Sequence, residues 1–222
     1  METNQKNQTI NSIYGDYQKH LCEILEALTN RLSKANEAYR LKNGEALYEH
    51  INGRIKSEQS MRDKCRRRGL PCTPYSALHE LTDAIGLRIV TTFREDIDQV
   101  IKIIEHFEDC RIIEKKDYIH NVKPNGYRSY HLILDYETPF EDVCGHTPGH
   151  YFVEIQLRTI AMDTWASLEH QVSYKKNIDP KREKLIRQEL KRCADELASC
   201  DISMQTIRNL IREDHAHENT AR

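Results

Sequence analysis

Leu87-Arg-Ile-Val-Thr-Thr92 is the stretch that decides the fold, because it marks the first strand of the central part of the chain. β-Branched side chains dominate it, as is typical of strands. Similar stretches follow at residues 110–119, 129–136 and 150–158, while residues 96–107 repeat apolar side chains at helical spacing. Strands that alternate with helices predict an α/β (α+β) domain, built around one mixed β-sheet that is flanked by helices.

Helical periodicity frames this central part on both sides. Before it, helices are predicted over residues 16–41, 45–51 and 57–68, with stops at Asn43-Gly44 and Asn52-Gly53. The polar residues 1–15 are expected to form a flexible N-terminus. After Thr159 the pattern is helical to the end of the chain.

One apolar seam in the C-terminal part repeats at intervals of four and three residues. Its members are Ile186, Leu190, Cys193, Leu197, Cys200, Met204, Ile207 and Ile211. Such a heptad seam requires a second helix to pack against, either the N-terminal helix of the same chain or a helix of another subunit. Cys193 and Cys200 are accordingly expected to be core residues rather than a redox pair.

The composition indicates a highly solvated protein. Of its 222 residues 31% are charged and 38% are hydrophobic, and no run approaches the roughly 20 apolar residues that span a bilayer. The polar N-terminus lacks the apolar stretch of a secretory signal, so a cytoplasmic protein without membrane contact is expected. Seven cysteines, an odd number without a Cys-x-x-Cys pair, argue against a disulfide framework or a zinc ribbon.

Cys144, His146 and His150 are the nearest approach to a metal cluster in the sequence. They supply three potential ligands within seven residues, in a loop that also contains glycines and a proline. A fourth ligand is missing from this stretch. A polar surface turn is therefore the favoured interpretation, with a zinc site as the alternative.

The net charge of −2 conceals a basic segment. Its cations are Arg54, Lys56, Arg62, Lys64, Arg66, Arg67 and Arg68. One interpretation is a solvated helix face, which is what most charge runs form. The other is a pocket for polyphosphates, which need several cations at once. Composition alone leaves both open.

Two short motifs place carboxylates on strands. Asp83-Ala-Ile-Gly-Leu-Arg88 leads into the first strand, and Glu154-Ile-Gln-Leu-Arg-Thr159 lies in the last. Alternation puts Glu154, Gln156 and Arg158 on one face of that strand, although exposed sheet surface is the simpler explanation for three polar residues. Two carboxylates on neighbouring strands, Asp83 and Glu154, are the usual minimum for holding Mg²⁺ against phosphates.

A third motif, Lys123-Pro-Asn-Gly-Tyr-Arg-Ser-Tyr-His131, combines a turn with the start of a strand. Asn125-Gly126 forces a tight turn, because glycine accepts positive φ. Alternation then places Tyr127, Ser129 and His131 on one face, where an aromatic ring, a hydroxyl and an imidazole could bind a base and a sugar or phosphate. Taken alone, an ordinary hairpin turn is the commoner explanation.

Together these motifs resemble the synthetase domain of the RelA/SpoT family of alarmone synthetases. The family's order is kept: Gly53-Arg-Ile-Lys-Ser57 with Ser60 and Lys64, then Asp83–Arg88, Lys116-Asp-Tyr-Ile119, Lys123–His131, Glu154–Thr159 and Trp165-Ala-Ser-Leu-Glu-His170. The resemblance covers roughly residues 20–180 and is closest to the single-domain RelQ type, without a hydrolase domain. It implies a synthetase domain over residues 16–178 and a C-terminal helical extension over residues 179–222 that serves oligomerisation.

The resemblance implies a GTP diphosphokinase of the stringent response. The 3′-hydroxyl of GTP or GDP would attack the β-phosphate of ATP, forming pppGpp or ppGpp and releasing AMP. Catalysis is assigned to Glu154, Asp83 and Arg88, with Asp83 and Glu154 as ligands of Mg²⁺. ATP would be bound by Arg54, Lys56, Ser60, Lys64 and Arg88. The guanosine nucleotide would be bound by Lys116, Lys123, Asn125, Tyr127, His131, Gln156 and Arg158, with Tyr127 stacked on guanine.

Expectations also concern the oligomeric state and the molecule that accepts pyrophosphate, and for the acceptor alternatives remain open. RelQ-like enzymes are tetramers, so a homotetramer is expected. A synthetase-like toxin that modifies adenosine nucleotides or the 3′ end of tRNA would share this chemistry, and the basic face over residues 62–68 could suit RNA. A catalytically inactive, nucleotide-sensing protein is the third possibility, and the presence of both Asp83 and Glu154 argues against it.

Overall fold

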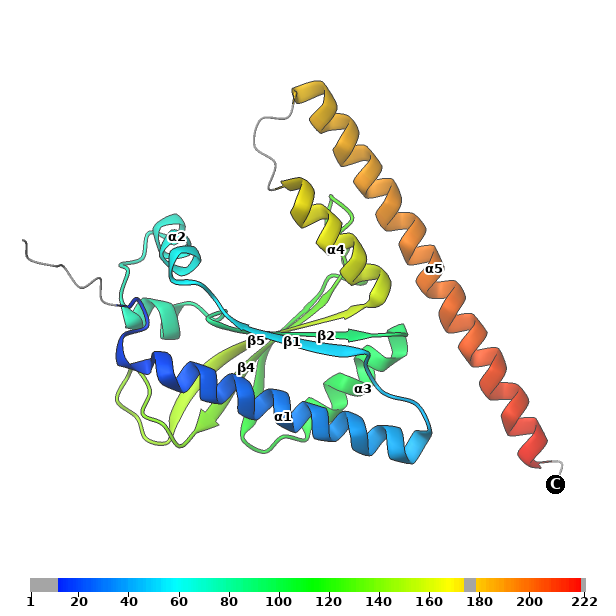
Figure 1. The fold of residues 1–222 in the computed structure, drawn as a ribbon, viewed down its shortest axis with the longest axis horizontal. Coiled ribbons are helices and arrows are strands. Elements are labelled where there is room, and N and C mark those ends of the chain that lie inside the picture. Colours follow the sequence, from blue (N-terminus) through cyan, green and yellow to red (C-terminus); the bar gives the residue numbers. More distant parts are fainter. Residues whose placement is uncertain (1–11, 174–178, 221–222) are drawn as a thin grey trace, which may run out of the picture.

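The computed structural model describes residues 12–173 and 179–220, and a five-stranded mixed sheet lies at its centre (Figure 1). Its strands are β1 (His50–Ile55), β2 (Ile85–Thr91), β3 (Cys110–Asp117), β4 (Tyr130–Thr138) and β5 (Gly149–Thr159). They lie in the order β1-β2-β5-β4-β3, and only the β2 and β5 pair is parallel. The predicted mixed-sheet fold is confirmed.

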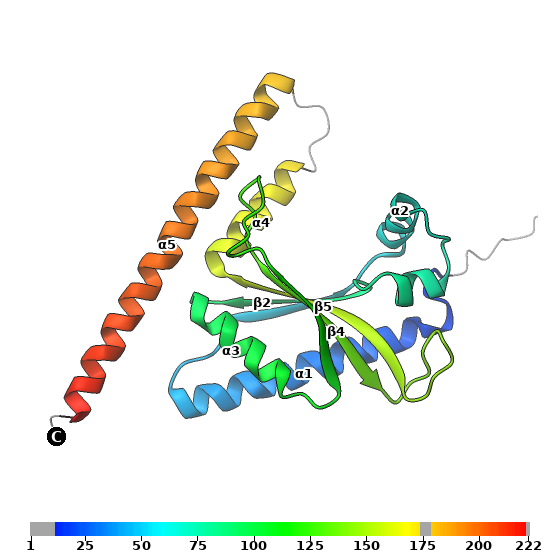
Figure 2. The ribbon, with the colours of Figure 1, turned by 180° about the vertical axis from the view of Figure 1, so that it is seen from behind.

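Helices cover both faces of the sheet. They are η1 (Gly15–Tyr17), α1 (Gln18–Asn43), α2 (Glu58–Arg68), η2 (Ser76–Glu80), α3 (Arg94–Glu105), α4 (Ile160–Ser173) and α5 (Pro180–Thr220). α1 and α3 lie on one face, whereas α2 and α4 stand apart from each other over the opposite face (Figures 1 and 2). Neither helix covers the part of the sheet that lies between them; this face is called the open face below.

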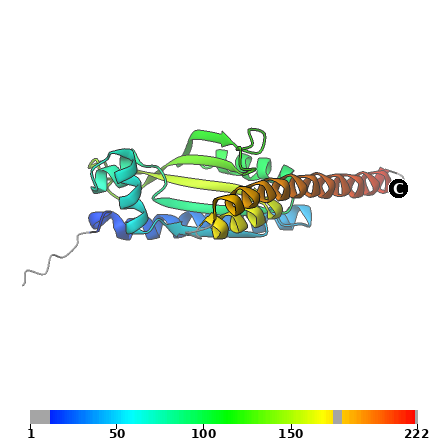
Figure 3. The ribbon, with the colours of Figure 1, turned by 90° about the horizontal axis from the view of Figure 1, so that it is seen from above.

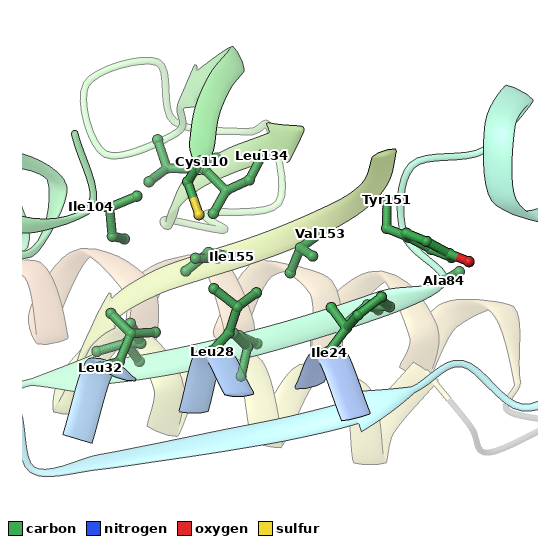
Figure 4. Close-up of a cluster of buried hydrophobic side chains, with 14 of the residues drawn as sticks. Ile24, Leu28, Leu32, Ala84, Ile104, Cys110, Leu134, Tyr151, Val153 and Ile155 are labelled. Carbon is green, nitrogen blue, oxygen red and sulfur yellow. The ribbon is translucent and has the colours of Figure 1, made fainter. Parts of the chain in front are cut away.

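The core lies between the sheet and the helices α1 and α3, as Figure 4 shows. Ile24, Leu28 and Leu32 recur at intervals of four along α1 and are almost wholly buried, as are Val153 and Ile155 of β5. Burying each such side chain contributes roughly 1.5–3 kcal/mol. Because side chains alternate along a strand, this packing turns the residues between them toward the open face.

The prediction of a short helix over residues 45–51 is wrong. Residues 45–49 form no helix, and His50 already belongs to β1. Oδ1 of Asn36 in α1 accepts hydrogen bonds from the backbone N–H groups of Leu47 and Tyr48, at 2.7 and 3.2 Å. This long-range capping satisfies the backbone without a helical turn, and sequence periodicity does not reveal it.

The predicted break at Asn52-Gly53 is also wrong, because both residues lie inside β1. A Cβ atom on Gly53 would lie 2.6 Å from Cδ1 of Leu25, which belongs to α1. The glycine thus lets the strand approach the helix closely rather than ending an element.

The predicted flexible segment, residues 1–15, includes residues that belong to the folded core. Residues 1–11 lie outside the described residues, but Ile13 and Tyr14 are buried in the core. The Tyr14 hydroxyl donates to the Lys56 carbonyl at 2.6 Å, just beyond β1. Burial, followed by the charge of Asp83, raises the pKa of Tyr14, so the hydroxyl remains a donor at neutral pH.

α5 packs mainly against α4 and α3, and its C-terminal part projects past the rest of the fold (Figure 3). A buried ion pair joins Arg208 of α5 to Asp96 of α3 at 2.6 Å. The predicted seam is only partly covered within the chain: Cys193 is half-buried, but Cys200 is exposed. The expectation that both cysteines lie in the core is therefore wrong for Cys200 in the single chain.

Within residues 12–173 and 179–220, the helices lack the combination of length and apolar character that a membrane crossing requires.

Candidate active site

The open face of the sheet carries a row of polar side chains from all five strands. Backbone pairing aligns Asn52, Arg88, Gln156, His131 and Lys116, in the order in which the strands lie. Alternation along β5 adds Glu154 and Arg158 on either side of Gln156. The register therefore brings together residues that are up to 104 positions apart in the chain (from Asn52 to Gln156).

A cavity of about 470 Å³ lies over the β1, β2 and β5 part of this row. Its lining includes Arg54, Lys56, Asp83, Arg88, Glu154 and Gln156. Six residues that were predicted from three separate motifs thus share one cavity. Two members of the basic segment, Arg54 and Lys56, thus line a cavity rather than an open helix face.

Two lysines meet one carboxylate on the α2 side of the cavity. The Lys56 ammonium forms a short ion pair with Oδ2 of Asp83, and Lys64 Nζ lies 2.7 Å from the same oxygen. The other oxygen, Oδ1 of Asp83, is buried and has no hydrogen-bond partner. A buried, unpaired carboxylate oxygen is costly, so Asp83 is ready to accept a cation or a hydrogen-bond donor.

Ser60 lies at the start of α2, one helical turn before Lys64. Ser57 caps this helix, accepting the backbone N–H of Ser60 at 3.3 Å, and its hydroxyl donates to the Ser60 hydroxyl at 2.9 Å. Residues four apart share a helix face, so Ser60 and Lys64 both face the same direction. Ser60 is absent from the cavity lining, which leaves its predicted role as a proposal.

Glu154 is the carboxylate at the centre of the row. His131 Nδ1 lies 3.3 Å from its Oε1, and Gln156 Nε2 donates to its Oε2 at 3.0 Å. Burial by itself would raise the pKa of Glu154, but the hydrogen bond and charge of His131, then Gln156 and Lys56, together lower it to about 2. The carboxylate is therefore ionised throughout the neutral range, as a metal ligand must be.

Four hydrogen bonds and one ion-pair contact join five side chains into a ring beside the cavity. Arg158 Nη2 donates to the Tyr127 hydroxyl at 2.9 Å and to Gln156 Oε1 at 3.0 Å. Tyr127 Oη lies 2.8 Å from His131 Nε2, and His131 and Gln156 both contact Glu154 as described above. We call Tyr127, His131, Glu154, Gln156 and Arg158 the polar ring. Because each member is held by two others, the ring is preorganised without a ligand.

Asp163 is a residue of this site that the sequence did not reveal. It lies in the first turn of α4, and its Oδ1 is 2.8 Å from Arg158 Nη1 and 3.3 Å from Arg88 Nη1. Burial, followed by the charge of Arg158, lowers the pKa of Arg88. Asp163 therefore offsets the repulsion between Arg88, which lines the cavity, and its neighbour Arg158. Its position directly after the Glu154–Thr159 motif is the only signal that marks it.

The loop before β4 is built by Asn125 and Gly126, as the turn chemistry predicts. The Asn125 side chain accepts the Tyr127 backbone N–H at 3.1 Å, and Gly126 has a φ of +95°. Asn125 thus has a local role in the turn. Ser129, predicted to lie beside Tyr127, is instead fully buried and donates to the Leu157 carbonyl at 3.1 Å.

An aromatic cluster surrounds the tip of this loop. Lys123 Nζ lies 4.3 Å from the centre of the Tyr118 ring and 4.9 Å from that of Tyr127. Tyr127 also meets the Trp165 ring edge to face, at 6.2 Å. Trp165 is buried and its indole N–H donates to the Leu190 carbonyl at 2.7 Å, so it is a packing residue. Tyr118, which had no assigned role, belongs to the site.

Comparison with known proteins decides the family. A family model described as "Region found in RelA / SpoT proteins" matches residues 53–179, more than half of the chain. The chain belongs to the RelA/SpoT family. Every motif from Arg54 to Arg158 on the open face lies inside the matched region of this RelA/SpoT domain.

Two relatives and one solved structure match most of this chain and most of their own length. GTP pyrophosphokinase YwaC of Bacillus subtilis (strain 168) is 38% identical over 187 residues, which cover 84% of this chain and 86% of the relative. GTP pyrophosphokinase YjbM of the same organism is 34% identical over 198 residues, covering 87% and 88%. The solved structure of small alarmone synthetase 1 from B. subtilis, bound to its product pppGpp, superimposes with a TM-score of 0.75 at 30% identity, covering 87% of this chain and 95% of that one.

Proposed function

We propose that this chain is a GTP pyrophosphokinase, which transfers pyrophosphate from ATP to the 3′-hydroxyl of GTP or GDP. The observation that carries the proposal is the shared cavity, in which cations and two carboxylates converge beside the polar ring. Relatives that align over more than four fifths of both chains are GTP pyrophosphokinases, and one solved relative holds pppGpp. The products would be pppGpp or ppGpp and AMP.

The α2 side of the cavity is proposed to bind ATP. Arg54 and Arg88 both line the cavity, from neighbouring strands, and guanidinium groups stack well on a purine base. Lys56 and Lys64 share one carboxylate oxygen of Asp83 in this structure. A bound triphosphate would form ion pairs with both lysines in place of this oxygen. Ser60 would add a hydroxyl donor from the same face of α2 as Lys64.

Asp83 and Glu154 are proposed to hold Mg²⁺. Both line the same cavity, Glu154 is ionised, and Oδ1 of Asp83 lacks a partner, so the residues present suit a hard cation. Bound Mg²⁺ would neutralise charge on the transferred phosphates. Lys56 would then release Asp83 for the metal and contact phosphate instead.

The guanosine nucleotide is proposed to bind on the β4 side of the cavity. Tyr127 offers its ring to the base, while its hydroxyl keeps it oriented through Arg158 and His131. Lys116, aligned with His131 across β3 and β4, and Lys123, over the two tyrosine rings, would meet the phosphates. Gln156 and Arg158 would hold the polar ring in place, and Asn125 would shape the loop.

The reaction would be an in-line displacement at the β-phosphorus of ATP. The 3′-hydroxyl loses its proton to solvent and its oxygen forms a bond to this phosphorus. The bond from the β-phosphorus to the oxygen that bridges to the α-phosphate breaks, and AMP leaves with that oxygen. A carboxylate whose pKa is about 2 accepts protons poorly at neutral pH. In this state Glu154 is therefore better suited to holding the metal than to taking the 3′-hydroxyl proton. Positioning and charge neutralisation would supply most of the rate.

A product assay tests this function. The purified chain would be incubated with ATP, Mg²⁺ and, separately, GTP, GDP, adenosine nucleotides or tRNA, and products would be identified by mass spectrometry. We expect a guanosine tetra- or pentaphosphate together with an equal amount of AMP. Pyrophosphate transfer to adenosine nucleotides or tRNA alone would assign the chain to the toxin-like class, and no transfer to any acceptor would refute the enzyme.

We further propose that the chain acts as a cytoplasmic homotetramer. Support comes from the part of the seam that the chain itself leaves uncovered: Ile207 and Ile211 are 57% and 52% exposed on α5. Apolar residues at these seam positions require another helix. Sedimentation at micromolar concentration should show a tetramer, which Ile207→Asp with Ile211→Asp would dissociate. Leu41→Asp, at an exposed apolar position of α1, is the control.

A further inference from the structure

The connection between β4 and β5 contains a cluster of metal-binding side chains outside the active site. Within the described residues, potential ligand atoms of Asp142, Cys144 and His146 lie within 4.8 Å of one another. The sequence had suggested Cys144, His146 and His150 instead. His150 is not a member, because its Nδ1 lies 2.8 Å from Oδ1 of Asp135.

Asp142 folds this connection so that the three side chains converge. Its Oδ1 accepts the backbone N–H groups of Cys144 at 2.8 Å and His146 at 3.1 Å, and its Oδ2 accepts that of His150 at 3.1 Å. These bonds fix the carboxylate at the base of the cluster, with Cys144 and His146 exposed above it.

A fourth candidate ligand approaches Cys144 from a distant segment, although it does not lie within 4.8 Å of all three members of the cluster. His79 of η2, 65 residues before Cys144, has its Nδ1 3.6 Å from Cys144 Sγ. Zinc bonds of about 2.3 Å to sulfur and 2.0–2.1 Å to nitrogen, at a tetrahedral angle, separate the two ligand atoms by about 3.6 Å. Asp142 Oδ2 and His146 Nδ1 lie 3.2 Å apart, near the roughly 3.3–3.4 Å of an oxygen and a nitrogen ligand on one zinc ion.

The ligand types select the class of metal. A thiolate and two imidazoles favour Zn²⁺ and its neighbours over Mg²⁺, which prefers oxygen ligands. The active-site pair, Asp83 and Glu154, offers oxygen only. The two sites would therefore take different ions from the same solution.

We propose that Asp142, Cys144, His146 and His79 bind one Zn²⁺ ion per chain. The ion would tie η2 to the β4–β5 connection. η2 precedes Asp83 by only three residues, and the His79 ring lies 6.4 Å from that of Phe152, which is two positions before Glu154 in β5. Metal binding would thus brace the segment that delivers Asp83 to the cavity. This proposal is independent of the reaction that the cavity performs.

The test uses the purified full-length chain, stripped with a chelator and kept reduced without thiols. Zn²⁺ would be titrated calorimetrically, and Co²⁺ would be added as a coloured substitute. We expect one site per chain, with the visible bands of tetrahedral Co²⁺ and a near-ultraviolet thiolate-to-cobalt band. Cys144→Ser should abolish the thiolate band, and His79→Gln should weaken binding by more than the about 10–100-fold that loss of a supporting group costs.

Matched variants separate this site from others. Cys22→Ser removes an exposed cysteine on α1, and His150→Gln removes the histidine that bonds to Asp135; both should bind zinc as the unaltered chain does. Circular dichroism would verify that each variant is folded. Stoichiometric binding that survives Cys144→Ser, or that is lost in Asp83→Asn instead, would overturn the proposal. So would a chain that binds no zinc at micromolar concentration.

Discussion

The α2 side and the β4 side of the cavity are built in opposite ways. On the α2 side, Lys56 and Lys64 surround one oxygen of Asp83 while its other oxygen is buried without a partner. On the β4 side, each of the five members of the polar ring already contacts two others. The α2 side is thus completed only by a ligand, whereas the β4 side is shaped in advance. Substitutions on the two sides should therefore have different signatures.

Glu154 belongs to both sides, so its loss should have the largest effect. Glu154→Gln keeps the shape and one hydrogen-bonding oxygen but removes the charge that a metal requires. We expect turnover at saturating ATP and GTP to fall at least about a hundredfold, as when a charge-stabilising group is removed. Product formation measures this, with exposed Glu108→Gln as the control. Unchanged turnover in Glu154→Gln would exclude the proposed mechanism.

The pH dependence of stability should reveal the same carboxylate in the absence of metal. The pKa of Glu154 is about 2 in the folded chain, against an ordinary 4.5. Because the folded pKa is the lower one, the stabilisation is present above about pH 4.5 and disappears as the pH falls toward 2. It amounts to on the order of 3 kcal/mol.

Urea unfolding at several pH values would measure this term. The difference in unfolding free energy between the unaltered chain and Glu154→Gln should shrink steadily from pH 5.5 to pH 3.5. A difference that stays constant over this range would mean that Glu154 is not held ionised by His131, Gln156 and Lys56.

Substitution of Tyr127 tests the β4 side of the cavity alone. Removing the ring in Tyr127→Ala should raise the KM for GTP or GDP about 10–100-fold, which corresponds to the 1–3 kcal/mol of stacking on one base. The KM for ATP should change little. Tyr127→Phe keeps the ring and loses the contacts to Arg158 and His131, so its effect should be smaller. Equal increases in both KM values would show that the two sides are not separate.

Substitution of Lys64 tests the α2 side of the cavity, and the effect of this substitution should be the smallest. Lys64→Met keeps much of the side chain's length and removes the charge, and Lys56 remains beside Asp83. We expect the KM for ATP to rise about tenfold, equivalent to about 1.4 kcal/mol, with the KM for GTP unchanged. Arg67→Met, an exposed residue of α2, is the matched control. A rise confined to the KM for GTP would contradict the assignment of the sides.

The parts of the site that follow from local alternation could be predicted from the sequence. Glu154, Gln156 and Arg158 share a face because β5 is a regular strand, and backbone pairing carries that face across to His131 and Arg88. Turn chemistry likewise revealed the role of Gly126, with its positive φ. In each case neighbours in the sequence determine the geometry.

The remaining parts depend on contacts between distant segments. Asn36 caps residues 47 and 48 from another element, which is why a helix was wrongly predicted there. Asp163 gains its role only when α4 brings it beside Arg88 and Arg158. His79 meets Cys144 across 65 residues, so the sequence alone left that cluster one ligand short. Contacts between such distant segments leave no periodic pattern in the sequence.

The close crossing of α5 over the Asn125-Gly126 turn constrains how sequences of this architecture can diverge. A Cβ atom at Gly126 would lie 2.6 Å from the Cβ of Ala194, so neither position can grow while the helix stays where it is. Relatives should therefore keep both positions small together. A relative with a bulky residue at the position of Ala194 should show a compensating change in the turn or a displaced helix, and this pair could be used to sort relatives by the placement of their terminal helix.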